Sequence, residues 1–249
     1  MDFSLFLPNM WDIWSKYWQL FLLTGLKNTL ILTCISVALG TVLGALVAIM
    51  KMSRVKLIRA IASVYVEVIR GTPILLQLYI FYFVLPNVLT FLKMSQFMWV
   101  SVALCINSAA YVSEVIRSGI QAVDKGQTEA ARCLGLSEKQ TMVRIILPQA
   151  VRNILPALGN EFIMMLKETS LASTFFLGDL MTSYSIVKGV TYLTLEPLTI
   201  VGIIYLCLTF PLSKLVDWYG RKMANPNSYK RHKNKTNRER KLFTGGRIG

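Results

Sequence analysis

Long apolar stretches limit the folds available to this chain more than any other feature of its sequence. Inside a bilayer the backbone must satisfy its own hydrogen bonds, so an apolar stretch of about 20 residues forms a transmembrane helix. Stretches of sufficient length lie at about residues 20–50, 57–85, 97–120, 155–177 and 197–216. The chain is 54% hydrophobic and only 16% charged, unlike an ordinary soluble domain. We therefore predict an all-α membrane protein with five transmembrane helices.

Composition divides the sequence into three segments. We predict an extracytoplasmic or interfacial segment over residues 1–19, a transmembrane domain over 20–222 and a basic tail over 223–249. The first segment carries aromatic residues typical of the bilayer interface, namely Trp11, Trp14, Tyr17 and Trp18. A signal peptide is not expected, because the first apolar stretch is too long and lacks a small-residue cleavage site.

Basic residues are concentrated in alternate loops, which predicts the orientation in the membrane. The loops after the first and third apolar stretches carry most of them: Lys51, Arg54, Lys56, Arg59, Lys125, Arg132, Lys139, Arg144 and Arg152. The other two loops carry one lysine each, Lys93 and Lys188. Because short basic loops stay on the cytoplasmic side, we expect the N-terminus outside and the C-terminus inside.

Most of the formal net charge of +14 comes from the residues beyond Gly220, which include the C-terminal tail. Apolar residues are sparse there, so the tail is not expected to fold alone. Its simplest role is to lie against anionic lipid. Nucleic-acid binding is the alternative, but the tail lacks the interleaved aromatic residues that would support it. We therefore expect a lipid partner and no nucleic acid.

The sequence offers no pattern for catalysis or for a metal site. The four cysteines show no paired spacing, and they are Cys34, Cys105, Cys133 and Cys207. The only histidine, His232, lies in the basic tail without nearby ligand partners. A glycine-rich phosphate loop of the GxxxxGK[ST] type is also absent from the sequence. We expect neither a cofactor nor enzymatic activity in this chain.

The cytoplasmic loop at about residues 124–148 has the local signals of two short helices joined by a sharp turn. Residues 126–134 are rich in helix formers, and Gly135 then allows the left-handed conformation common at helix ends. Ser137 followed by Gln140 is a capping box that starts a second helix. Pro148 is expected to kink or end that helix near Leu147.

Residues 129–148 read EAARCLGLSEKQTMVRIILP and fit the pattern E-A-A, three residues, G, nine residues, I-x-L-P at every fixed position. This pattern resembles the cytoplasmic loop by which membrane subunits of bacterial ABC importers hold their ATPase. The resemblance implies that the coupling helix uses Glu129, Ala130, Ala131, Leu134 and Gly135. Small side chains would let this helix enter a groove on a partner. An amphipathic helix resting on the membrane surface is the alternative.

Three further blocks, at residues 66–86, 107–127 and 147–171, resemble permeases that import polar amino acids. The resemblance implies a fold like that of type I ABC importers, in the bacterial cytoplasmic membrane. Two permeases would pair, each would dock one ATPase, and a solute-binding protein would deliver the amino acid. Because this chain lacks a phosphate loop, ATP would be hydrolysed by another polypeptide.

Polar groups within the apolar stretches are candidate contacts for the solute. Gly71-Thr72-Pro73 interrupts the second stretch, and an interrupted helix frees backbone groups near a pathway. Asn160 and Glu161 enter the start of the fourth stretch, and Met164 follows one turn later. These residues could bind the amine and polar groups of an amino acid. Helix packing and pairing with a neighbouring subunit are the alternatives.

Two acid–base pairs have a spacing of three residues, Glu67 with Arg70 and Glu114 with Arg117. On a helix this spacing allows each pair to form an ion pair. We expect them to hold helices together around the cytoplasmic loop, or to take part in gating.

These features together predict the permease subunit of an ATP-driven importer of polar amino acids. Import of another small solute, such as an opine or a modified amino acid, remains an alternative. A membrane scaffold or regulator without a solute path is an alternative from another class. The sequence does not determine which amino acid is carried, or whether the second permease is a copy of this chain.

Overall fold

The computed structural model describes residues 3–223, and this part of the chain is helical with no β-strand. Its α-helices are α1 (Phe6–Gln19), α2 (Lys27–Lys51), α3 (Lys56–Gly71), α4 (Ile74–Tyr79), α5 (Leu85–Val88), α6 (Gln96–Gln121), α7 (Lys125–Cys133), α8 (Glu138–Thr141), α9 (Leu147–Glu168), α10 (Leu180–Thr191) and α11 (Leu195–Met223). The π-helical segments are η2 (Leu20–Leu26), η3 (Ile80–Val84) and η4 (Met142–Ile146), and the 3-10 segments are η1 (Phe3–Leu5) and η5 (Thr169–Phe175). The all-α prediction is confirmed, and the prediction for the basic tail falls almost entirely outside these residues.

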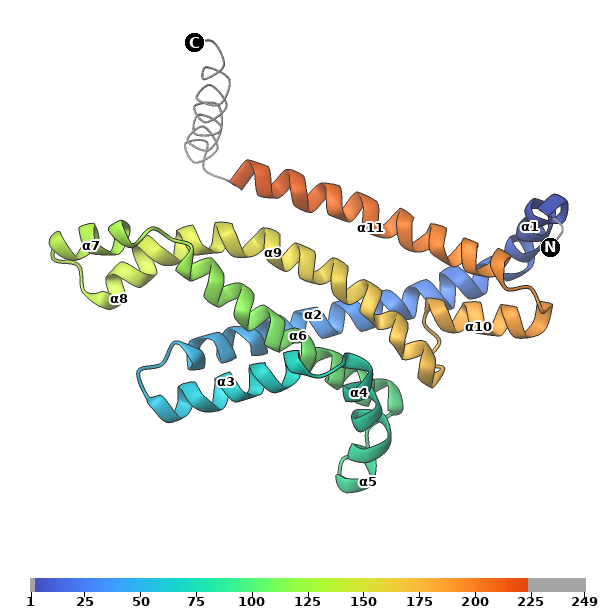
Figure 1. Ribbon diagram of the computed structural model, residues 1–249, viewed down its shortest axis with the longest axis horizontal. Helices are drawn as coiled ribbons and strands as arrows, with labels where there is room; N and C mark the ends of the chain where they lie inside the picture. Colours follow the sequence, from blue (N-terminus) through green and yellow to red (C-terminus); the bar gives the residue numbers. More distant parts are fainter. Residues whose placement is uncertain (1–2, 224–249) are drawn as a thin grey trace, which may run out of the picture.

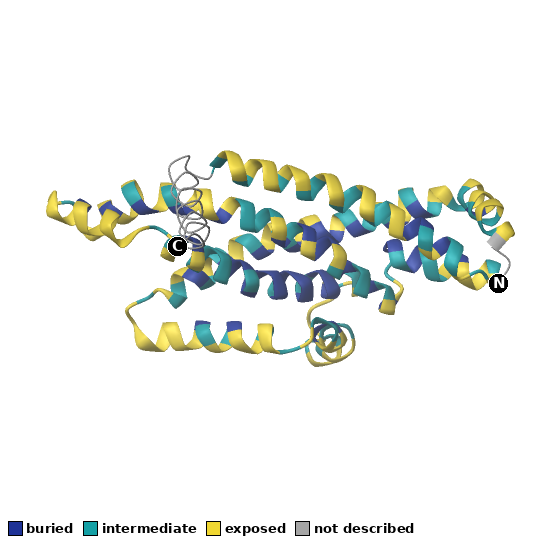
Figure 2. Ribbon diagram, turned by 45° about the horizontal axis from the view of Figure 1, so that its top comes forward, coloured by how far each residue is buried: buried dark blue, intermediate teal, exposed yellow. Residues whose placement is uncertain are grey.

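The long helices α2, α6, α9 and α11 form the body of the molecule (Figure 1). Each contacts the next, because α2 packs on α6, α6 on α9 and α9 on α11. The α7–α8 pair lies at one end of this body, and α1 and α10 lie at the other. Buried residues gather in the middle of the body, whereas α7 and α8 are mostly exposed (Figure 2). This arrangement separates the projecting loop from the core of the helical body.

Small residues let α2 approach α6 closely. Gly40, Gly44 and Ala48 recur every four positions and are all buried. A Cβ at Gly40 would lie 2.7 Å from Ser108 Cβ, and one at Gly44 would lie 2.8 Å from Ala109 O. Glycine is therefore required at both crossings, as expected for close helix packing in lipid.

Among the described residues, three helical stretches are long and apolar enough to cross a membrane. They are Phe6–Lys51, Gln96–Gln121 and Leu195–Met223. The pair Lys56–Gly71 and Ile74–Val88 raises the number to four if this pair, bent by 103°, is one span. The predicted span at 155–177 corresponds to α9 and η5, but α9 already begins at Leu147. Length and composition alone thus give three or four spans, and the predicted count of five is not confirmed.

The predicted break in the second apolar stretch is confirmed. Helix α3 ends at Gly71, and Thr72 and Pro73 are extended, with ψ angles of 145° and 133°. Proline disfavours the helical conformation of the residue before it, which explains why the break includes Thr72. The chain then turns into α4, so one apolar stretch becomes two helices at a steep angle.

Candidate functional site

The first half of the projecting loop, residues 124–148, has the local structure that the sequence predicted. Helix α7 ends where Gly135 takes a positive φ of 82°. Gly135 N–H donates to Arg132 O at 3.0 Å, and Leu136 N–H donates to Ala131 O at 3.1 Å. These bonds satisfy carbonyls that the helix end leaves unpaired. The predicted turn at Gly135 is confirmed.

Helix α8 starts with the predicted capping box. Ser137 Oγ accepts from Gln140 N–H at 3.3 Å, and Gln140 Oε1 accepts from Ser137 N–H at 2.9 Å. We expected Pro148 to kink or end this helix near Leu147. The helix does not end there, because η4 carries the chain directly from α8 into α9. A kink near Leu147 stays a prediction. Pro148 lies in the first turn of α9, where a missing N–H is tolerated, and the wider π-helical turn precedes it.

The five predicted coupling residues lie together on α7 and its turn. Glu129, Ala130, Leu134 and Gly135 are exposed, whereas Ala131 is buried and only 4% exposed. Leu134 is a large apolar side chain that is 83% exposed, so no other part of the described chain covers it. Ala131 thus lies on the side of α7 that faces the rest of the loop. The other four residues form an exposed surface that includes Leu134.

The break between α3 and α4 is stabilised by a side chain that the sequence analysis missed. Because Pro73 has no N–H, Ile69 O loses the partner that a continuous helix would give it. Gln77 Nε2 donates to Ile69 O at 2.7 Å and to Thr72 O at 3.2 Å. Gln77 is itself only 6% exposed. Its carboxamide therefore replaces the hydrogen bond that proline removes.

Asn107 on α6 holds this carboxamide in place. Asn107 Nδ2 donates to Gln77 Oε1 at 3.0 Å, and Asn107 is 3% exposed. The hydroxyl of Thr72 donates to Val68 O at 2.8 Å and accepts from Gln77 Nε2 at 2.9 Å. The sequence signal that could have pointed to this network is a pair of uncharged amides within two apolar stretches.

We expect Gln77→Met to destabilise the protein by about 2–4 kcal/mol, because it leaves buried carbonyl oxygens without a donor at nearly unchanged volume. Unfolding of the purified protein in detergent would measure the loss. Asn87→Leu is the matched control, since Asn87 Nδ2 donates to Phe83 O at 2.6 Å in an exposed position. That control should cost less than about 1 kcal/mol. Equal losses in both variants would contradict the role given to Gln77.

A half-buried cluster centres on Glu114 of α6. Its carboxylate accepts hydrogen bonds from Lys51 Nζ and, at 2.7 Å, from Arg117 Nη2. Arg70 Nη1 lies 3.9 Å from the same carboxylate, and its guanidinium lies 5.2 Å from the Tyr111 ring centre. The cluster thus joins the ends of α2 and α3 to α6.

The expected Glu114–Arg117 ion pair is confirmed. The expected Glu67–Arg70 pair is wrong, because Arg70 turns toward Glu114 and Tyr111, and Glu67 enters none of the ion pairs among the described residues. The spacing along α3 allowed Arg70 to pair with Glu67. The packing of α3 on α6 instead placed Arg70 near Glu114, which is distant in the sequence.

The predicted solute residues on α9 do not share one environment. Asn160 and Met164 lie one turn apart and are exposed, with Met164 46% exposed. Glu161 is buried, 7% exposed, and enters none of the ion pairs found within residues 3–223. These residues lie in the middle of α9, because the helix begins eight residues before the predicted apolar stretch.

Thr72 lies on a different element, at the break between α3 and α4. Within that break its hydroxyl donates a hydrogen bond to Val68 O and accepts one from Gln77 Nε2. No hydrogen bond among the described residues joins Thr72 to Asn160 or Glu161. The hydrogen bonds of Thr72 therefore stabilise the break between α3 and α4.

A helical membrane body with a broken span and a projecting helix–turn–helix defines a transport permease subunit. The chain belongs to the family described as "binding-protein-dependent transport system inner membrane component", whose model matches residues 40–225. It is 42% identical to the arginine transport system permease protein ArtQ of Bacillus subtilis (strain 168), over 90% of this chain and 98% of that protein. It is 38% identical to the nopaline transport system permease protein NocM of Agrobacterium fabrum (strain C58 / ATCC 33970), over 80% and 87%.

Solved structures agree on the fold. A crystal structure of an amino acid ABC transporter with histidines contains a chain 46% identical to this one, with a TM-score of 0.79, covering 84% of this chain and 96% of that one. An inward-facing MetNI methionine ABC transporter is 19% identical with a TM-score of 0.64, covering 81% and 95%, and supports the fold alone. The chain has the type I ABC importer permease fold and is the permease subunit of an amino acid ABC importer.

Proposed function

We propose that the permease crosses the bacterial cytoplasmic membrane five times, with its N-terminus outside and its C-terminus in the cytoplasm. The three long spans and the bent α3–α4 pair account for four crossings. Helix α9 supplies the fifth, since its 22 residues extend about 33 Å against a hydrocarbon core of about 30 Å. Basic residues in the loop after α2 and in the α7–α8 loop support the same orientation.

The α7–α8 loop is the proposed dock for a separate ATPase. The observation that carries this proposal is Leu134, exposed beside a Gly135 turn at the far end of the molecule (Figure 1). A compact helix with small residues and one projecting leucine fits a groove on a folded partner. Movement of that partner would pass through α8 and η4 directly into α9, because these segments form one uninterrupted helical run.

The proposed assembly has two permeases, two ATPases and a solute-binding protein. Gentle purification of the chain from its native membrane, followed by identification of its companions by mass spectrometry, tests this proposal. An ATPase recovered in comparable amount would support it, and the number of permease species would distinguish a homodimer from a heterodimer. Recovery of the chain without an ATPase would favour the scaffold or regulator.

We propose a polar amino acid as the solute, with an opine or a modified amino acid as the second candidate. Support for the first comes from the similarity to an arginine permease and to a glutamine permease of Bacillus subtilis (strain 168), and for the second from the similarity to a nopaline permease. Competition of labelled arginine uptake by glutamine and by nopaline in reconstituted vesicles would separate these candidates.

We propose that Glu161, with Asn160 and Met164 on α9 and Thr72 at the break, contributes to the solute path. A buried carboxylate needs a cation or a proton as a partner. Its electrostatic neighbours include Glu168 on the same helix and Arg70 on α3. An amino or guanidinium group of the solute would be a suitable partner for Glu161.

Glu161→Gln is expected to raise the KM for a cationic amino acid by about 10- to 100-fold, the range for losing a hydrogen bond to a charged group. Uptake kinetics in vesicles that contain the whole complex would measure this change, with the ATPase rate as a check on coupling. Glu67→Gln is the control, since it makes the same change at an exposed carboxylate that enters none of the ion pairs among the described residues. Unchanged KM in Glu161→Gln would assign this residue to packing.

A further inference from the structure

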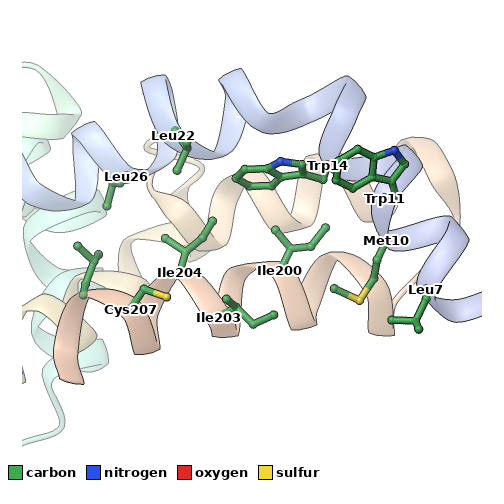
Figure 3. A pocket seen from close by; sticks show the side chains of 11 residues that line it. Leu7, Met10, Trp11, Trp14, Leu22, Leu26, Ile200, Ile203, Ile204 and Cys207 are labelled. Carbon is green, nitrogen blue, oxygen red and sulfur yellow. The ribbon is translucent and has the colours of Figure 1, made fainter. Parts of the chain in front are cut away.

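A hollow of about 560 Å³ lies between α1, η2 and α11, at the end of the molecule opposite to the α7–α8 loop (Figure 1). Trp11, Trp14 and Leu22 belong to one wall, and Ile200 and Ile204 of α11 belong to the facing wall (Figure 3). The lining as a whole is aliphatic, aromatic or sulfur-containing, with no hydroxyl, amide or charged side chain. The solute path proposed above uses none of these residues.

Both walls of the hollow belong to helices that are suited to the bilayer. The first wall lies on Phe6–Lys51 and the second on Leu195–Met223, two of the stretches that are long and apolar enough to cross a membrane. Water is a poor occupant, because it needs about two to four polar partners and this lining offers only the indole N–H groups of Trp11 and Trp14. The surrounding medium that matches this lining is the hydrocarbon of the membrane.

Polar contacts mark one end of the hollow. Asn9 Nδ2 donates to Glu196 Oε1 at 3.4 Å and joins α1 to the start of α11. On α1, Asp12 and Lys16 form an ion pair whose side chains are both more than 60% exposed. Trp11, at the edge of the hollow, is 71% exposed. Exposed charges on one face and aromatic residues on the other are typical of a helix at the bilayer interface.

The depth of the hollow matches one leaflet of a bilayer. Along α11 it extends from Ile200, one turn after Glu196, to Leu208, a rise of about 12 Å. One leaflet contributes about 15 Å of hydrocarbon.

We propose that this hollow is a binding site for one acyl chain of a membrane glycerophospholipid, whose polar head lies at the Asn9–Glu196 rim. A flexible, slender hydrocarbon chain fits both the volume and the depth, and it covers apolar side chains that the protein leaves uncovered. Next to the hollow, Ile13 and Phe21 are buried in one apolar cluster with residues of α10 and α11, among them Ile200 of the lining. The bound chain joins α1 to α11 through contacts that neither helix makes alone.

The test uses the whole importer complex in lipid nanodiscs that contain a phospholipid with a diazirine in the middle of one acyl chain. After irradiation, peptide mass spectrometry locates the adducts. We expect labelling of the peptides around Leu22 and Ile204 to exceed, by about tenfold, that of the exposed face of α2 at Leu39 and Leu46, since a site that buries roughly two more CH₂ groups gives a difference of this size.

Cys207→Trp fills the hollow, and Leu206→Trp is its matched control, because Leu206 is 63% exposed and does not line the hollow. Labelling at Leu22 and phospholipid retained through detergent purification should both fall in Cys207→Trp and persist in Leu206→Trp. Labelling no stronger than that of α2, or unaffected by Cys207→Trp, would overturn the proposal. Protection of Leu22 that depends on pairing of two permeases would assign the hollow to a subunit interface instead.

Discussion

Gly135→Arg is expected to reduce ATP-driven uptake to background while the permease remains folded in the membrane. Gly135 has a φ of 82°, and a Cβ at this position would meet nothing within 4 Å. The new side chain therefore meets only a local strain of about 1–2 kcal/mol from the left-handed backbone. Its bulk and charge would stand beside Leu134, on the surface proposed to enter the ATPase. Uptake in vesicles and the amount of copurified ATPase would measure the effect.

The control for this prediction is Gly135→Asn, since asparagine adopts the left-handed conformation more readily than other residues with a side chain. This variant keeps the turn and adds little bulk, so it should retain most of the uptake. A second variant, Leu134→Asp, removes an apolar contact without disturbing the fold, because Leu134 is 83% exposed. Normal copurification of the ATPase with Gly135→Arg and Leu134→Asp would reject the docking surface.

Glu114→Gln is expected to destabilise the permease by about 1.5–3 kcal/mol, the range for losing hydrogen bonds to a charged group, because the cluster is half-buried. The Glu114 and Lys51 side chains are 17% and 14% exposed, so Lys51 would keep its charge without an anionic partner. Arg117, which bonds the same carboxylate, would also lose its anionic partner and keep only its hydrogen bond to Gln121. Unfolding of the detergent-purified protein, followed with temperature or denaturant, would measure the loss.

Glu138→Gln is the control for this cluster. It breaks the Arg54–Glu138 pair, whose side chains are 84% and 66% exposed. An exposed ion pair contributes about 0–1 kcal/mol, so stability should change little. If Glu114→Gln were as mild as Glu138→Gln, the cluster around Glu114 would have no special part in holding α2, α3 and α6 together.

Local rules of the chain were enough to predict much of the α7–α8 loop and the broken span. The turn at Gly135, the capping box of Ser137 and Gln140, and the break at Thr72-Pro73 all depend on residues a few positions apart. Such preferences act within one turn of a helix, so they can be detected in sequence before any packing is known. The family resemblance added the function, because the motif around these local signals was complete.

The extent of α9 could not be predicted in the same way. The apolar stretch suggested a start near residue 155, and Pro148 suggested an interruption near Leu147. The structure instead continues the helix from α8 through a π-helical turn. Apolar content marks where a helix can enter lipid, but it does not mark where the helix begins, since polar helical turns extend beyond the bilayer.

The sequence by itself thus determined the helical class, the membrane setting and the local shape of the α7–α8 loop. Tertiary structure alone decided that Gln77 replaces the missing hydrogen bond of Pro73, that Asn107 positions Gln77, and that Arg70 turns from Glu67 to Glu114. The physical reason is range. Capping and backbone preferences involve neighbours along the chain, whereas polar and charged side chains take the partners that helix packing brings within about 3–4 Å.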